Sequence, residues 1–224
     1  MLSPKDLSDL KKAFPFILEL GENYKPFTEA LVLSNHVSGC PVMDGNGSCS
    51  RVIFVTSGLI RIYKLSEDGK EITLYRIGRG ETCILTAACL LGQGEVPFPV
   101  AATAEQDTTF YALPSNYFKI LFYASPPVQR FIFSALSSKF YTVLGLLEDV
   151  AFKKTSDRLM DFLIVKTGSG AYPLYATHES VAAELGTARE VVSRLLKEME
   201  IRGQVILSRG KIILLHIPDA PQQV

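Results

Sequence analysis

Four polar residues near the C-terminal end of the 224-residue chain have the types and spacing that can recognise a base pair. Arginine donates two parallel hydrogen bonds to the two acceptors of guanine, and glutamate accepts one from the amino group of cytosine. Serine can contact either a base or a phosphate. These side chains are Arg189, Glu190, Ser193 and Arg194, and their types favour contact with a groove of duplex DNA.

Two helical segments joined by a glycine are expected to hold these residues. The first helix covers 177–185, where Thr177 is a suitable N-cap and His178 follows it. Gly186 permits a tight turn, and Thr187 is expected to cap a second helix. That helix covers 189–202 and has Val191, Val192, Leu195, Leu196 and Met199 on its apolar side. A helix, a turn and a second helix in this order place the second helix in the major groove.

A short basic hairpin is predicted after the second helix. Residues 204–208 and 212–215 have the composition of strands, and Arg209 and Lys211 lie at the turn, where they suit phosphate contacts. From residue 186 to 215 there are six basic residues, Lys197 among them, against three acidic ones, whereas the whole chain has 23 of each. DNA binding would therefore depend on local charge. A solvated charged surface is the alternative interpretation of the same pattern.

The N-terminal half has the composition of a small β structure. A short helix and its exit are expected within 4–20, and β-branched runs broken by Gly, Asp and Asn then extend from 31 to 113. The pair Asp68-Gly69 indicates a hairpin turn. The clearest strand candidates are 52–58, 59–65, 71–77 and 108–113. So many short strands predict a barrel or roll whose interior can hold a ligand.

Ser125-Pro126-Pro127 opens a long helical stretch that is expected to end near Lys153. Apolar residues recur along it at spacings of three and four, which is typical of a helix that pairs with another helix. A second apolar set, Ile132, Ala135 and Leu146, lies off this line, so one face can pack on the roll while the other forms a homodimer. Alternatively, the apolar residues of this helix only cover the roll and form no dimer. The residues of the expected dimer interface are Phe133, Leu136, Phe140, Val143, Leu147 and Val150.

The motifs together resemble the cyclic-AMP receptor protein/FNR (Crp/Fnr) family of bacterial transcription regulators. The match is densest over 177–197, which reads T-H-E-x-V-A-x-E-L-G-T-x-R-E-V-V-S-R-L-L-K, followed by Gly203 and the Arg-Gly-Lys turn. Upstream, Val55-x-x-Gly58-x-Ile-Arg-Ile, Asp68-Gly69 and Gly80-Glu81 agree in the same order. The resemblance covers nearly the whole chain.

The resemblance implies an α+β protein with three parts. These are an effector-sensing, cyclic-nucleotide-binding-like β-roll (a double-stranded β-helix) over 1–124, a dimerisation helix over 125–153, and a winged helix-turn-helix over 154–224. It also implies a homodimer on a palindromic operator with TGA-like half-sites, recognised through Glu190, Ser193 and Arg194. A role as an activator, with RNA polymerase as a candidate partner, belongs to the same expectation, although the sequence leaves activation and repression open.

The expected effector is a small molecule or a redox signal, and cyclic AMP is not favoured. Gly80 and Glu81 open the effector loop, but 95–103 lacks the arginine that binds the cyclic phosphate in the family, and a buried phosphate without a partner is costly. Residues 1–39 contain no cysteine, whereas the iron–sulfur sensors of the family carry a cluster of them there.

Four cysteines are candidates for a redox switch. Cys83 and Cys89 lie in the effector loop, and Cys40 and Cys49 lie upstream among Gly, Asp and Asn residues. Buried, unreactive thiols are the alternative for the first two, and a bound metal, haem or cluster is a third possibility. Their spacings match no standard zinc pattern, so no metal or cofactor is assigned.

The sequence favours a cytoplasmic protein without a membrane segment, because no basic leader precedes an apolar run and no stretch of about 18 apolar residues occurs. A cupin-like metal-dependent enzyme is one alternative, but the chain has only His36, His178 and His216, and two of these lie in the C-terminal part. A cyclic-nucleotide-binding module that acts on protein partners is another. No catalytic residue is predicted.

Overall fold

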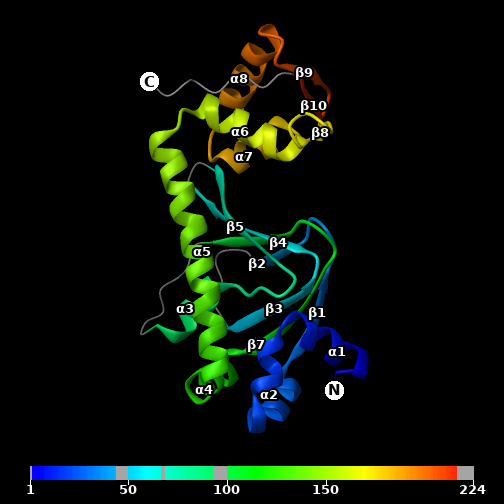
Figure 1. Ribbon diagram of the computed structural model, residues 1–224, viewed down its shortest axis with the longest axis vertical. Coiled ribbons are helices and arrows are strands. Elements are labelled where there is room, and N and C mark those ends of the chain that lie inside the picture. The colour runs from blue at the N-terminus through cyan, green and yellow to red at the C-terminus, as the bar shows by residue number, and fades with distance from the viewer. Residues whose placement is uncertain (1, 44–49, 67–68, 93–99, 216–224) are drawn as a thin grey trace. The chain divides into compact units, whose positions relative to one another are not determined.

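The computed structural model describes residues 2–43, 50–66, 69–92 and 100–215 (Figure 1). The chain divides into two compact units. The first contains residues 1–64 and 74–144, and the second contains residues 65–73 and 145–224.

Two sheets form the centre of the first unit, with strand orders β1-β7-β3 and β2-β6-β4-β5. Four of the strands match the runs predicted from the sequence to within two residues at each end. The bounds are β1 (Val32–His36), β2 (Pro41–Met43), β3 (Arg51–Ser57), β4 (Leu59–Leu65), β5 (Glu71–Gly78), β6 (Ala101–Ala104) and β7 (Thr108–Pro114). The pairing of β4 with β5 agrees with the predicted hairpin, although Asp68 of its turn lies outside the described residues.

Alternation along β3 gives this sheet two buried faces. Val52 and Phe54 belong to a cluster formed with the helices, whereas Val55 and the partly buried Ile53 face the interior of the roll. Successive side chains of a strand point to opposite faces, so a single strand contributes to both cores. The roll therefore has an interior separate from the helix-packed outer cluster.

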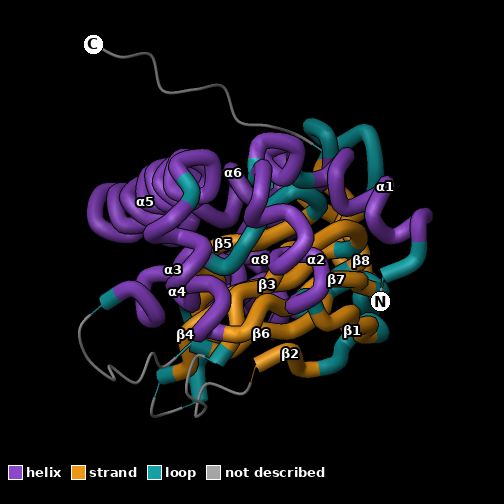
Figure 2. Tube along the Cα trace, turned by 90° about the horizontal axis from the view of Figure 1, so that it is seen from below, coloured by secondary structure: helices purple, strands orange, loops and turns teal. Residues whose placement is uncertain are grey.

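Short helices cover the outer face of the first sheet. Phe14, at the end of α1, packs edge-on against Phe54 with ring centres 5.3 Å apart, and a capping box between Ser3 and Asp6 starts the same helix. Near the other end of the sheet, α3 contacts α4 (Figure 2). The bounds are α1 (Pro4–Ala13), the 3-10 turns Pro15–Glu19 and Gly21–Asn23, α2 (Tyr24–Ala30), α3 (Ile84–Leu91) and α4 (Ser115–Ala124).

Three of these helices were not predicted from the sequence. The segment after Gly80-Glu81, expected as an effector loop, instead forms α3, and α2 and α4 had no predicted counterpart. The run Ile84–Leu91 is apolar nearly throughout, because it packs against both the outer cluster and the roll interior. Such a run lacks the one-sided apolar pattern that reveals a surface helix.

The long helix α5 (Pro126–Phe152) has the predicted extent. Within the first unit it is fixed to the roll by Ile132 and by Lys139, whose ammonium donates to Glu81 Oε1 at 2.5 Å and to the carbonyl of Arg76 at 2.8 Å. Among the described residues, α5 is also the one helix that could cross a membrane by length and composition alone. A soluble helix that pairs through one apolar face meets the same criterion.

The second unit is a small helical core with a three-stranded sheet of order β8-β10-β9. Leu159 and Leu163 of one helix, Val181 of the next, and Val192 and Leu196 of the third are fully buried together. The bounds are α6 (Thr155–Thr167), β8 (Leu174–Tyr175), α7 (His178–Leu185), α8 (Arg189–Ile201), β9 (Val205–Ser208) and β10 (Lys211–Leu214). The predicted helix, glycine turn, helix and hairpin are thus confirmed.

We predict that Phe54→Ala lowers the free energy of unfolding of the first unit by about 3–5 kcal/mol, because it removes a ring that is fully buried among four other aromatic rings. Urea denaturation followed by circular dichroism measures the change. Leu18→Ala is the control, since its side chain is 68% exposed. Equal losses for the two variants would contradict the placement of Phe54 in the core.

Candidate nucleic-acid interface

The first helix of the pair begins with a reciprocal cap. Ser180 N–H donates to Thr177 Oγ1 at 3.0 Å, and Thr177 N–H donates to Ser180 Oγ at 3.1 Å. These bonds satisfy two donors that the start of a helix otherwise leaves free. The predicted N-cap role of Thr177 is therefore confirmed. The helix ends at Gly186, whose φ of 61° favours glycine and turns the chain toward α8.

The predicted cap of α8 was wrong. Its N-cap is Ala188, and no side chain caps it. Thr187 instead completes the turn that ends α7, because its N–H donates to the carbonyl of Ala182 at 3.0 Å. The uncapped start of α8 leaves the backbone N–H groups of Arg189 and Glu190 without helical partners, and such groups suit a phosphate oxygen.

The apolar residues of α8 face the core and leave a polar face outward. Val192, Leu195, Leu196 and Met199 are buried, while the side chains of the opposite face are exposed. Glu190, Arg194 and Lys197 follow one another at intervals of four and three residues, so they share this face. The exposed face of α8 therefore carries the groups that the sequence assigns to base and phosphate contacts.

A hydrogen bond joins the two helices at the predicted reader Ser193. His178 Nδ1 lies 2.8 Å from Ser193 Oγ, which is hydrogen-bond distance. The bond fixes the start of α7 against α8 and partly satisfies the serine hydroxyl. Sequence reasoning placed both residues at the DNA, but nothing in the pattern indicated that they contact each other.

Exposed ion pairs orient two cations of α8. Arg194 lies 3.4 Å from Glu198, and Lys197 lies 2.6 Å from Glu200. Glu200 also accepts from the N–H of Leu207 at 3.3 Å. The hydrogen bond from Lys197, followed by that from Leu207, lowers the pKa of Glu200 below its ordinary value. Glu200 thus stays ionised and connects α8 to β9, a role that the sequence did not reveal.

A groove of about 750 Å³ lies between the start of α7, the side of α8 and the β9–β10 turn, which we call the basic groove. Six predicted DNA-binding residues line it, namely Thr177, His178, Arg189, Lys197, Arg209 and Lys211. Glu179 and Glu200 are its acidic lining residues, so cations outnumber anions by four to two. Thr187, Glu190, Ser193 and Arg194 do not line it.

One aromatic residue beside the basic groove was not anticipated. Tyr175 of β8 is paired in register with Lys211 of β10, and the lysine ammonium lies 5.7 Å from the centre of the tyrosine ring. The contact is within the range of a cation–π interaction. A two-residue strand has no detectable alternation, so only the folded sheet reveals this neighbour.

The sensor candidates of the roll lie in different surroundings. Glu81 is held by Lys139 and by the N–H of Gly78, and Gly80 adopts a φ of 81°. Cys83 is 2% exposed, and its sulfur lies 4.0 Å from the hydroxyl of Tyr75. Burial, followed by the neighbouring Cys83, raises the pKa of Tyr75 above its usual value.

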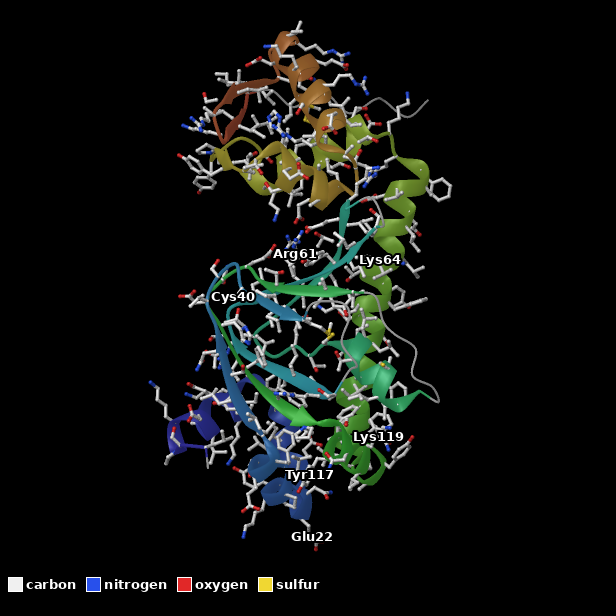
Figure 3. All side chains as sticks on the ribbon, turned by 180° about the vertical axis from the view of Figure 1, so that it is seen from behind. Glu22, Cys40, Arg61, Lys64, Tyr117 and Lys119 are labelled. Atoms are coloured by element: carbon white, nitrogen blue, oxygen red, sulfur yellow. The ribbon has the colours of Figure 1, made fainter. Side chains whose placement is uncertain are left out.

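The remaining cysteines are more accessible than Cys83. Cys89 on α3 is partly exposed, as is Cys40 in the turn between β1 and β2 (Figure 3). Cys49 lies outside the described residues. Among the residues that the structure describes, no group of three or more potential metal ligands comes together.

The expected dimer residues of α5 lie mainly in solvent. Phe133, Leu136, Phe140, Leu147 and Val150 are all exposed, whereas Val143 is partly buried and packs against the interior cluster of the roll. The off-line residues Ile132 and Ala135 also pack against the first unit.

Comparison with known proteins supports a regulator built from these two parts. Residues 38–124 match the cyclic nucleotide-binding domain, and residues 157–219 match the Crp-like helix-turn-helix domain. A crystal structure of a Crp/Fnr-family transcriptional regulator from Eubacterium rectale is 33% identical, covers 92% of this chain and 95% of its own, and has a TM-score of 0.82. The fold and groove therefore define a DNA-binding transcription regulator with a cyclic-nucleotide-binding-type domain.

Two curated relatives agree. The Cyclic AMP receptor protein of Thermus thermophilus is 28% identical over 78% of this chain and 79% of its own length. The Global nitrogen regulator of Synechococcus elongatus is 21% identical over 92% of this chain and 93% of its own length. The chain belongs to the Crp/Fnr family of transcription regulators and is not an enzyme.

We predict that Thr177→Ala lowers the free energy of unfolding of the second unit by about 1 kcal/mol, because it removes the cap of α7. Urea denaturation of the full chain, followed by circular dichroism, measures the effect. Ser208→Ala is a matched control, since Ser208 is exposed and makes no side-chain hydrogen bond within the described residues. A loss no greater than that of the control would show that the capping box contributes nothing.

Proposed function

We propose that the chain acts as a homodimer on a palindromic operator, with α8 of each subunit in the major groove and the β9–β10 turn on the neighbouring phosphates. The observation that carries the proposal is the convergence of Arg189, Lys197, Arg209 and Lys211 on the basic groove. Four cations from a helix and a hairpin suit an extended polyanion, and the phosphates of duplex DNA are such a partner.

Base recognition falls to the exposed face of α8. Arg194 pairs with guanine and Glu190 accepts from cytosine, while Ser193 contacts a base or a phosphate beside them. These residue types favour TGA-like half-sites. In a symmetric dimer the half-site centres lie about one helical turn apart, or roughly 34–36 Å.

Dimerisation through α5 is supported by its uncovered apolar line. Phe133, Phe140 and Leu147 are each 58–59% exposed, and they are spaced by seven residues. A heptad spacing keeps one face of a helix against its partner, and such a row in water favours association. Val143 lies at the edge of this apolar face and packs against the roll, so it would contribute to the contact with the roll and to the dimer contact.

The signal is proposed to act in the roll, and the protein to work in the cytoplasm as an activator that contacts RNA polymerase. We favour a small-molecule effector over a thiol switch at Cys83, because the thiol of Cys83 is enclosed and reactive cysteines are accessible ones. Cyclic AMP remains disfavoured, since 95–103 contains no arginine for its phosphate.

The residues proposed to contact bases (the readers) and those proposed to contact phosphates (the anchors) are expected to respond differently to substitution. Glu190→Ala and Arg194→Ala should each weaken binding to an operator selected by the wild-type protein by about 1–3 kcal/mol, with little change on random duplexes. Lys211→Ala should weaken binding to both and reduce the salt dependence by about one counterion. Fluorescence anisotropy at several salt concentrations measures these effects.

Lys119→Ala on α4, in the first unit, is the control for a lost positive charge (Figure 3). It should leave both affinities unchanged. If Glu190→Ala, Arg194→Ala and Lys211→Ala all lost the same affinity on operator and random DNA, the division into readers and anchors would be wrong.

Leu147→Glu should convert the dimer to monomer, because it places a charge in the exposed apolar line of α5. Analytical ultracentrifugation without DNA measures the mass. Ser138→Glu adds the same charge at an exposed position on the other side of the helix and should leave the dimer intact. An unchanged mass for Leu147→Glu, or a monomeric wild type, would exclude this interface.

A further inference from the structure

The interior of the roll contains a cavity of about 530 Å³ that the DNA-binding function does not use. Both sheets and α3 contribute to its lining, and it lies within the first unit. This volume falls within the usual range for small-molecule sites. The chemistry of its walls therefore indicates what kind of molecule it takes.

A single arginine lies at the edge of this cavity on the interior side of β3. Arg51 shares the face of Ile53 and Val55, because side chains alternate along the strand and Val52 and Phe54 pack on the outer cluster. Its side chain is exposed and forms no hydrogen bond or ion pair within the described residues. A guanidinium in this position offers an unused fork of donors to a carboxylate.

Polar groups of β1 also line the cavity. Ser34 lies opposite Phe110 in the strand register, so Ser34 and His36 face the same interior. Ser34 Oγ lies 3.2 Å from His36 Nε2, and the imidazole stacks on the ring of Phe110 with centres 5.2 Å apart. The described lining includes Arg51 and His36 but no acidic side chain. The cavity is therefore suited to an anion rather than a cation.

The other walls are mainly apolar. Ile62 and Ala102 of the second sheet and Ala112 of the first line the cavity and are buried. One polar group stands among them, since Thr86 is only 7% exposed and makes no side-chain hydrogen bond within the described residues. Thr86 lines the cavity, so its hydroxyl is available to a ligand there.

We propose that this cavity binds a small monocarboxylate with an apolar body. The carboxylate pairs with Arg51 at the mouth, the apolar body lies against Ile62, Ala102 and Ala112, and Thr86 supplies a further hydrogen bond. A cyclic nucleotide fits less well, because its ribose and base would bury several polar groups against aliphatic walls. The proposal rests on the proposed function only in that such a ligand would be the effector of DNA binding.

Isothermal titration calorimetry of the full-length protein with octanoate tests the site. Octanoate should bind saturably and with one site per chain, and the neutral octanamide should bind at least about tenfold more weakly because it loses the charged hydrogen bonds to arginine. Cyclic AMP is titrated in parallel. Equal affinity for octanoate and octanamide, or tighter binding of cyclic AMP than of octanoate, would overturn the proposal.

Variants locate the binding. Arg51→Gln should weaken octanoate binding by at least about tenfold, and Thr86→Val, which keeps the shape of the side chain, should weaken it about threefold or more. Lys64→Gln removes one positive charge from β4 outside the cavity and should leave affinity unchanged (Figure 3). Wild-type affinity in Arg51→Gln would overturn the assignment.

The calorimetry contains no DNA, so its result does not depend on the operator experiments. A protein that binds octanoate through Arg51 but fails to select any operator would contradict the proposed function alone. A protein that selects an operator but gives no saturable octanoate binding would contradict the cavity proposal alone.

Discussion

A buried lysine joins the roll to the long helix, and it is a charged contact that fixes this helix within the first unit. The ammonium of Lys139 is almost removed from water and is held by Glu81 and by the carbonyl of Arg76. Glu81 also accepts from the N–H of Gly78, so the same carboxylate fixes the turn after β5. A charge that loses its solvent needs partners in good geometry. If the turn at Glu81 moves, the carboxylate that holds Lys139 of α5 moves with it.

The same helix has two distinct faces, one packed on the roll and one exposed to solvent. Toward the roll it presents Ile132, Ala135 and Lys139, while Phe133, Phe140 and Leu147 remain in solvent. Because Val143 lies between these faces, a shift of α5 on the roll would change the side chains available for the proposed pairing with a second subunit. An effector that binds two arrangements of the roll with different affinities would then shift the population of proposed dimers able to bind DNA. The free energy of that shift cannot exceed the difference in binding free energy of the effector for the two arrangements.

Local sequence patterns predicted the elements that depend on residues close together in the sequence. The Thr177 cap, the turn at Gly186 and the apolar side of α8 follow from residue type and period, and they were right. The α3 helix was missed because its residues are apolar on nearly every side, and Thr187 was misplaced because its backbone closes the preceding turn. Contacts between distant segments, such as His178 with Ser193, leave no trace in a local pattern.

The energies of the ion pairs on α8 bear on which residues could make the proposed base contacts. Arg194 is held by an exposed pair with Glu198 four residues away, and such pairs contribute only about 0.3–0.5 kcal/mol. A bidentate contact with guanine discriminates by about 1–3 kcal/mol, so the ion pair with Glu198 would not prevent the proposed contact of Arg194 with a base. Lys197 is less free, because Glu200 is also bonded to the backbone of β9. Arg194 would thus be available for base recognition, whereas Lys197 is held by Glu200 in the wall of the basic groove.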